Sequence, residues 1–167
     1  MATGSLAPTA AARRLSRGGA IMALAGIGFV GYGLLFLVQS FTGFLELGIS
    51  EAEVDVGRAD IQQFSPSLYH YLSHLHIALA GFIAAVGIAV AALAWFGVRR
   101  GELWAWVTAV VVPVFALAVA LPAHYPYHLD TAGHLGLVYA DTVLFTVGAV
   151  LALAGLQARR DPVGSAA

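Results

Sequence analysis

The sequence predicts an all-α integral membrane protein, with four transmembrane helices in an antiparallel bundle and both termini in the cytoplasm. The first observation behind this fold class is composition. Of the 167 residues, 60% are hydrophobic and 10% are charged, whereas about a quarter of an ordinary soluble domain is charged. The second observation is that four apolar segments each approach the ~20 residues that a helix needs to cross a bilayer. A third observation, the placement of arginine, gives the orientation.

Each apolar segment is predicted to be a helix, because lipid cannot satisfy an open strand edge and four short segments cannot close a barrel. Ser65 and Pro66 form a typical helix start before the second segment, and Pro122 ends the third. The predicted spans cover residues 20–41, 66–98, 103–121 and 131–156, within a transmembrane domain over 20–157. We expect a tail over 1–19, an acidic outer loop over 43–65 and a second tail over 158–167.

Arginine residues flank the spans in a pattern that predicts the topology. All but Arg58, which lies in the acidic loop, precede the first span, separate the second from the third or follow the fourth, so an even number of crossings places them on one side: Arg13, Arg14, Arg17, Arg99, Arg100, Arg159 and Arg160. Basic residues favour the cytoplasmic face. We therefore expect a multi-pass protein of a bacterial or archaeal cytoplasmic membrane, with the loops 43–65 and 122–131 outside.

Composition also limits the chemistry and the partners. The chain has no cysteine, which excludes disulfides, thiolate ligands and iron–sulfur clusters. Its formal net charge of -1 gives no sign of nucleic-acid binding. The expected partners are the lipid bilayer, a lipid-phase substrate, and a second copy of the chain or another subunit of a membrane complex.

All six histidines fall near the predicted outer end of the bundle. Histidine is costly inside lipid, and it is a common metal ligand and proton carrier. His76, His124 and His134 lie about 22 to 25 residues from the charged residues that mark the inner face, which is roughly one bilayer thickness along a helix. Glu46 reaches the same layer if the first helix extends beyond its apolar segment.

Residue spacing groups some of these side chains further. His70 and His74 are four residues apart and share a helix face, an arrangement that allows two imidazoles to hold one ion. Asp130, His134 and Asp141 also share one face of the fourth span. Asp141 lies in an otherwise apolar stretch, where a carboxylate must pair, become protonated or face water.

The patterns His70-x-x-x-His74 and Asp130-x-x-x-His134 are similar to those of the alkaline ceramidase and adiponectin-receptor superfamily of zinc membrane hydrolases. The His-x-x-x-His spacing also resembles that of membrane di-iron desaturases and hydroxylases. The first family has more helices than four spans can supply, and the second uses more histidines, on the cytoplasmic side. Neither resemblance therefore transfers an activity to this chain.

Three hypotheses for function follow, and whether the protein is an enzyme stays open among them. The leading one is a divalent transition metal (zinc, iron or copper) at the outer mouth, serving a hydrolase or oxidoreductase that acts on a lipid-phase substrate. Its predicted ligands are His70, His74 and His134, with Asp130 or Asp141 as a ligand or as an orienting group, and with His124 and Glu46 as further candidates.

The second hypothesis is a haem or chlorophyll site, in which His74 or His76 would ligate a tetrapyrrole opposite His134. The third is a non-catalytic membrane subunit or scaffold whose histidines are only interfacial. Metal content and an absorption spectrum distinguish the three.

Overall fold

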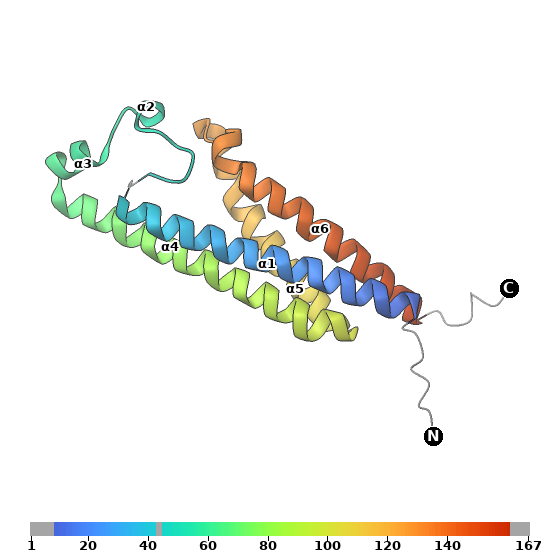
Figure 1. Ribbon diagram of the computed structural model, residues 1–167. Helices are drawn as coiled ribbons and strands as arrows, with labels where there is room; N and C mark the ends of the chain where they lie inside the picture. Colours follow the sequence, from blue (N-terminus) through green and yellow to red (C-terminus); the bar gives the residue numbers. More distant parts are fainter. Residues whose placement is uncertain (1–8, 43–44, 161–167) are drawn as a thin grey trace, which may run out of the picture.

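The computed structural model describes residues 9–42 and 45–160, and these residues form helices and connecting turns without any strand. The four long helices are α1 (Ala10–Thr42), α4 (Pro66–Ala92), α5 (Leu103–Ala120) and α6 (Ala132–Arg160) (Figure 1). Together with the short turns that extend them, they give four helical segments that are long and apolar enough to cross a membrane. The predicted all-α class is therefore confirmed for the described residues, with four helices of the length and composition that a membrane span requires.

Shorter elements connect these helices. Two short helices follow α1, and single turns of π or 3₁₀ type extend α4 and α5. In chain order they are α2 (Glu51–Val54), α3 (Arg58–Phe64), η1 (Leu93–Gly97), η2 (Val98–Arg100), η3 (Leu121–Ala123) and η4 (Tyr125–Tyr127).

The helix ends follow local sequence signals in several places. The Ser65 hydroxyl accepts the backbone N–H of Leu68 at 3.2 Å, with Pro66 in the first turn of α4, as the sequence predicts. Between α1 and α4, the Glu53 carboxylate accepts both the backbone N–H of Ser50 at 2.6 Å and its hydroxyl at 2.9 Å, and these bonds lower the pKa of Glu53. By contrast, α1 begins at Ala10, well before residue 20, where the first span is predicted to start.

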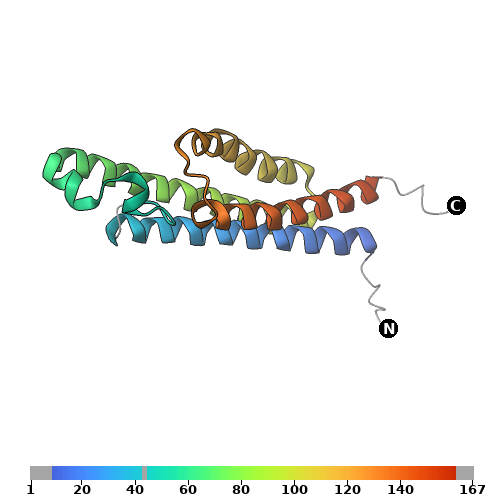
Figure 2. The same cartoon turned by 90° about the horizontal axis from the view of Figure 1, so that it is seen from above.

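Helix α1 lies between α4 and α6 and packs along both (Figures 1 and 2). Glycines allow this close approach. A Cβ atom on Gly26 would lie 2.8 Å from the carbonyl oxygen of Gly87 in α4, and one on Gly18 would lie 2.7 Å from that of Gly148 in α6. The backbones of the three helices are therefore in direct contact, as is common at small-residue interfaces in membranes.

The bundle is closely packed at the end where α1 begins and α6 finishes. Trp106 in α5 donates its indole N–H to the carbonyl of Ala149 in α6 at 3.0 Å, and Arg159 donates to the carbonyl of Arg100 at 2.9 Å. Towards the other end, α6 diverges from α1 (Figure 1). The buried cluster at the packed end comprises Met22, Ala23, Ala94, Val98, Ala105, Ala109, Ala149 and Ala152.

Candidate metal centre

Three potential metal ligands meet at the open end of the bundle: Glu46, His124 and His134. They come from the segment after α1, the turn that follows η3, and the first turn of α6. One ligand atom from each residue lies within 4.8 Å of the other two. In the part of the chain that the structure describes, this is the one group of three or more such side chains.

His134 is held rigidly. Its side chain is 1% exposed, and the Thr131 hydroxyl accepts its backbone N–H at 3.3 Å at the start of α6. Its ring Nδ1 lies 2.8 Å from the carbonyl oxygen of Leu47. A carbonyl can only accept a hydrogen bond, so Nδ1 carries the proton. In the neutral ring, Nε2 therefore keeps its lone pair.

Glu46 faces that lone pair. Its Oε2 lies 3.2 Å from His134 Nε2, yet Nε2 is buried and makes no hydrogen bond to any of residues 9–42 or 45–160. An ionised carboxylate and a neutral imidazole nitrogen are both acceptors. The approach of Glu46 Oε2 to His134 Nε2 therefore requires one of two arrangements. Either a proton on Nε2 makes an ion pair with the carboxylate, or both atoms bind the same cation.

His124 completes the group with the same tautomer. Its Nδ1 lies 3.0 Å from the carbonyl of Ala120 and 3.2 Å from that of Leu121, near the end of α5. The ring lies beside that of His134, with centroids 5.1 Å apart. Because Nδ1 donates to a carbonyl, Nε2 of His124 also keeps its lone pair, as is usual when a second group orients a metal-binding histidine.

The segment that carries Glu46 is pressed against the start of α6. Gly48 has a φ of 80°, and a Cβ atom there would collide with the carbonyl of Gly133 and lie 2.6 Å from the backbone nitrogen of His134. Sequence reasoning did not identify Leu47, Gly48 or Thr131 as parts of the site. The available signals were a glycine just after the candidate ligand Glu46, and a threonine at the N-cap position before His134.

The three candidate ligands lie at one end of a cavity of about 310 Å³ inside the bundle. Its other walls come from all four long helices and are almost entirely apolar or aromatic, so the cavity is suited to a hydrophobic molecule. They are Phe29, Tyr32, Phe36, Leu79, Phe82, Ile83, Val86, Ala116, Leu117, Ala120, Leu121, Leu135 and Val138.

The other predicted ligands lie elsewhere. His70 and His74 are exposed and line a separate cavity with Arg58. They lie on α4, and α1 separates α4 from α6, which carries His134. Asp130 is exposed and is not in the ligand group. His76, the predicted tetrapyrrole ligand, packs edge-on against Phe36 with ring centroids 5.7 Å apart.

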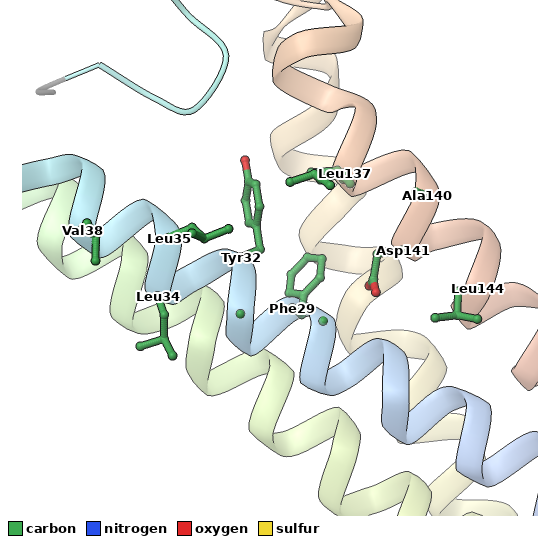
Figure 3. A pocket seen from close by; sticks show the side chains of 12 residues that line it. Phe29, Tyr32, Leu34, Leu35, Val38, Leu137, Ala140, Asp141 and Leu144 are labelled. Atoms are coloured by element: carbon green, nitrogen blue, oxygen red, sulfur yellow. The ribbon is translucent and has the colours of Figure 1, made fainter. Parts of the chain in front are cut away.

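Asp141 lies deeper along α6 and is also outside the ligand group. It lines both a groove of about 670 Å³ between α1 and α6 and an inner cavity of about 270 Å³. Figure 3 shows Asp141 projecting from α6 towards α1, which carries Phe29 and Tyr32. A Cβ atom on Gly28 would lie 2.6 Å from Asp141 Oδ1, so the glycine provides the space that the carboxylate occupies.

No family model, no curated protein and no solved structure matches the chain. The functional interpretation therefore rests on the geometry of the site.

Proposed function

We propose that the protein binds a divalent transition metal through Glu46, His124 and His134. The observation that carries this proposal is the approach of Glu46 Oε2 to His134 Nε2 at 3.2 Å without a hydrogen bond, while the Nδ1 atom of His134 is committed to the Leu47 carbonyl. Imidazole nitrogen and carboxylate oxygen together suit zinc, iron or copper.

Two histidines and one carboxylate are the protein ligands of several catalytic metal sites, which keep a further coordination position open. A metal so bound would supply Lewis acidity or activate water or oxygen. The cavity beside the ligands is mostly apolar and is lined by the membrane-length helices. We therefore propose a metal-dependent hydrolase or oxidoreductase whose substrate is a hydrophobic molecule of the lipid phase.

The proposed orientation is an antiparallel bundle with both termini in the cytoplasm and the metal centre near the opposite face. Contacts at the packed end support it. A Cβ atom on Gly101 would contact the Arg159 side chain, and one on Gly155 would lie 3.0 Å from the carbonyl of Ala11. The arginines that follow α4 and α6 therefore share one end with the start of α1, as the positive-inside rule requires.

The test is metal content after purification without added chelator. We expect the wild-type protein to contain a stoichiometric transition metal, and we expect the variants Glu46→Gln and His134→Ala to lose most of it. Loss of one ligand commonly weakens a site by more than the tenfold to hundredfold cost of losing an orienting partner. Removal of the metal should also lower the melting temperature, because an ion that binds only the folded state stabilises it.

His128→Asn is the matched control. His128 is an exposed histidine in the same outer turn, with a φ of 57°, and asparagine tolerates that conformation well. This variant should keep its metal. A wild-type protein that contains no metal, and whose melting temperature does not respond to zinc, iron or copper, would show that Glu46 and His134 form only an ion pair.

A further inference from the structure

A second polar pocket lies on the outer half of α4, separate from the proposed metal centre. It has a volume of about 310 Å³, and none of its lining residues belongs to the metal centre or to the cavity beside that centre. One cation, two imidazoles and two hydroxyl-bearing serines line it, and no carboxylate does. The lining residues are Ser40, Phe41, Arg58, Tyr69, His70, Ser73, His74 and Ile77.

Arg58 supplies the positive charge. Its Nη1 donates to the carbonyl of Phe41, near the end of α1, at 3.3 Å, and its guanidinium lies over the ring of Tyr69 at 5.2 Å. Acidic residues surround Arg58 in the sequence, but within the described ranges no carboxylate oxygen lies within 4.0 Å of its guanidinium. A guanidinium has several N–H donors in a planar fork that matches phosphate and carboxylate geometry, so donors remain for a ligand.

Ser73 supplies a hydroxyl that is unpaired within the described part of the chain. Its Oγ is buried and has no hydrogen-bond partner among the described residues, whereas the Ser40 hydroxyl already donates to the carbonyl of Phe36 at 2.8 Å. A buried polar atom without a partner is unusual and costs free energy unless something binds it. Residues 70, 73, 74 and 77 recur at helical spacing, so the hydroxyl and both imidazoles face the same pocket.

We propose that this pocket binds the phosphate group of a phospholipid. Arg58 would hold the anion, while Ser73 and the His70 and His74 rings would donate hydrogen bonds to its oxygens. The guanidinium disfavours a metal cation at the histidine pair, because two positive charges in one pocket repel each other. Phe41 and Ile77 offer apolar surface for the first methylenes of an acyl chain, which favours a lipid over free phosphate.

The experiment measures binding to the full-length protein in a phosphate-free detergent. Three probes distinguish the sources of the phosphate: phosphatidylglycerol, inorganic phosphate, and diacylglycerol, which has the same chains without the phosphate. We expect phosphatidylglycerol to bind most tightly. Arg58→Gln should weaken it by about tenfold or more and Ser73→Ala by a few fold, in line with the loss of charged hydrogen bonds.

Arg160→Gln, at the opposite end of the molecule, is the matched control and should bind phosphatidylglycerol as the wild type does. Ser73→Ala removes a hydroxyl that has no partner among residues 9–42 and 45–160, and it should not lower the melting temperature, so its effect on lipid binding cannot be attributed to misfolding. Both pocket variants should keep the metal content of the wild type, which separates this proposal from the metal centre.

Equal binding of diacylglycerol and phosphatidylglycerol would overturn the proposal, as would full affinity in both pocket variants. Inorganic phosphate that binds as tightly as phosphatidylglycerol would exclude a lipid as the preferred ligand. Zinc binding that is lost in a variant with both His70→Ala and His74→Ala, together with no phosphate binding, would show a metal site instead.

Discussion

At the scale of single residues, the proposed metal centre depends on backbone carbonyls that fix the protons of two imidazoles. The carbonyl of Leu47 fixes the tautomer of His134, and the carbonyls of Ala120 and Leu121 fix that of His124. In both rings, Nε2 then has a lone pair that can bind a metal ion. Candidate histidines can be found in the sequence, but their tautomers follow from backbone atoms whose positions only the fold determines.

Gly48 positions the segment that contains Glu46 and the Leu47 carbonyl. We expect Gly48→Ala to reduce metal content strongly while leaving the helices intact, because alanine is strained at a φ of 80° and its Cβ would collide with Gly133. The displaced segment would move both Glu46 and the Leu47 carbonyl away from His134. Metal analysis together with circular dichroism checks the expectation.

Gly136→Ala is the control for this change, since a Cβ atom there would meet nothing within 4 Å. It lies on the same helix as His134 and should keep the metal. If Gly48→Ala binds metal as the wild type does, the segment 45–50 does not position the site.

Residue counting in the sequence correctly placed Glu46, His124 and His134 near one level, because depth along a helix follows from its rise per residue. It could not give their lateral positions. His70 and His74 were predicted to join His134, but α1 lies between the helices that carry them. Which side of a neighbouring helix a residue faces depends on tertiary packing, and no periodicity in one segment determines it.

At the scale of elements, α1 organises the bundle because its small residues face two neighbours at once. Gly26 contacts α4 through Gly87, while Gly18 contacts α6 through Gly148. The helical type and the approximate positions of the four long helices followed from apolar segments in the sequence, although α1 begins at Ala10 and not near residue 20. The central position of α1 did not, since small residues are equally suited to contacts within one chain and between chains.

This arrangement predicts opposite effects for two glycines on α1. Gly26→Ala should destabilise the protein by about 1–3 kcal/mol, because the new methyl group would collide with the backbone of α4. Gly31→Ala should be neutral or stabilising by up to about 1 kcal/mol, because a Cβ atom there meets nothing within 4 Å and alanine favours a helix.

Thermal unfolding of the two variants in the same detergent measures the difference. Equal melting temperatures for Gly26→Ala and Gly31→Ala would mean that α1 and α4 do not approach as closely as the structure shows.

At the scale of the whole molecule, the bundle is packed at its arginine-rich end and open at the end that holds the proposed sites. The buried cluster and the Trp106 hydrogen bond close the first end, while the proposed metal centre and the pocket beside Arg58 occupy the second. The groups proposed to bind ligands therefore gather at one end of the bundle.

Labelling with an impermeant maleimide tests which side this is. The chain has no cysteine of its own, so the maleimide can label only the single cysteine that is introduced. We expect Asp55→Cys to react in intact cells, whereas Ala167→Cys should react only after the membrane is opened, because the positive-inside rule places the arginine-rich end in the cytoplasm. The reverse pattern would place the metal centre at the cytoplasmic face.

The end of α1 has a further consequence. Arg58, in the proposed phosphate pocket, donates to the Phe41 carbonyl near the end of α1, and Glu46 follows α1 by only a few residues in the sequence. Both proposed sites therefore include a residue that lies close in the sequence to the end of α1. If occupancy of one site changes the affinity of the other, thermodynamic linkage makes the effect reciprocal: a lipid that changes the affinity for the metal must have its own affinity changed by the same factor. The membrane's composition would then regulate the metal centre without any contact between the two ligands.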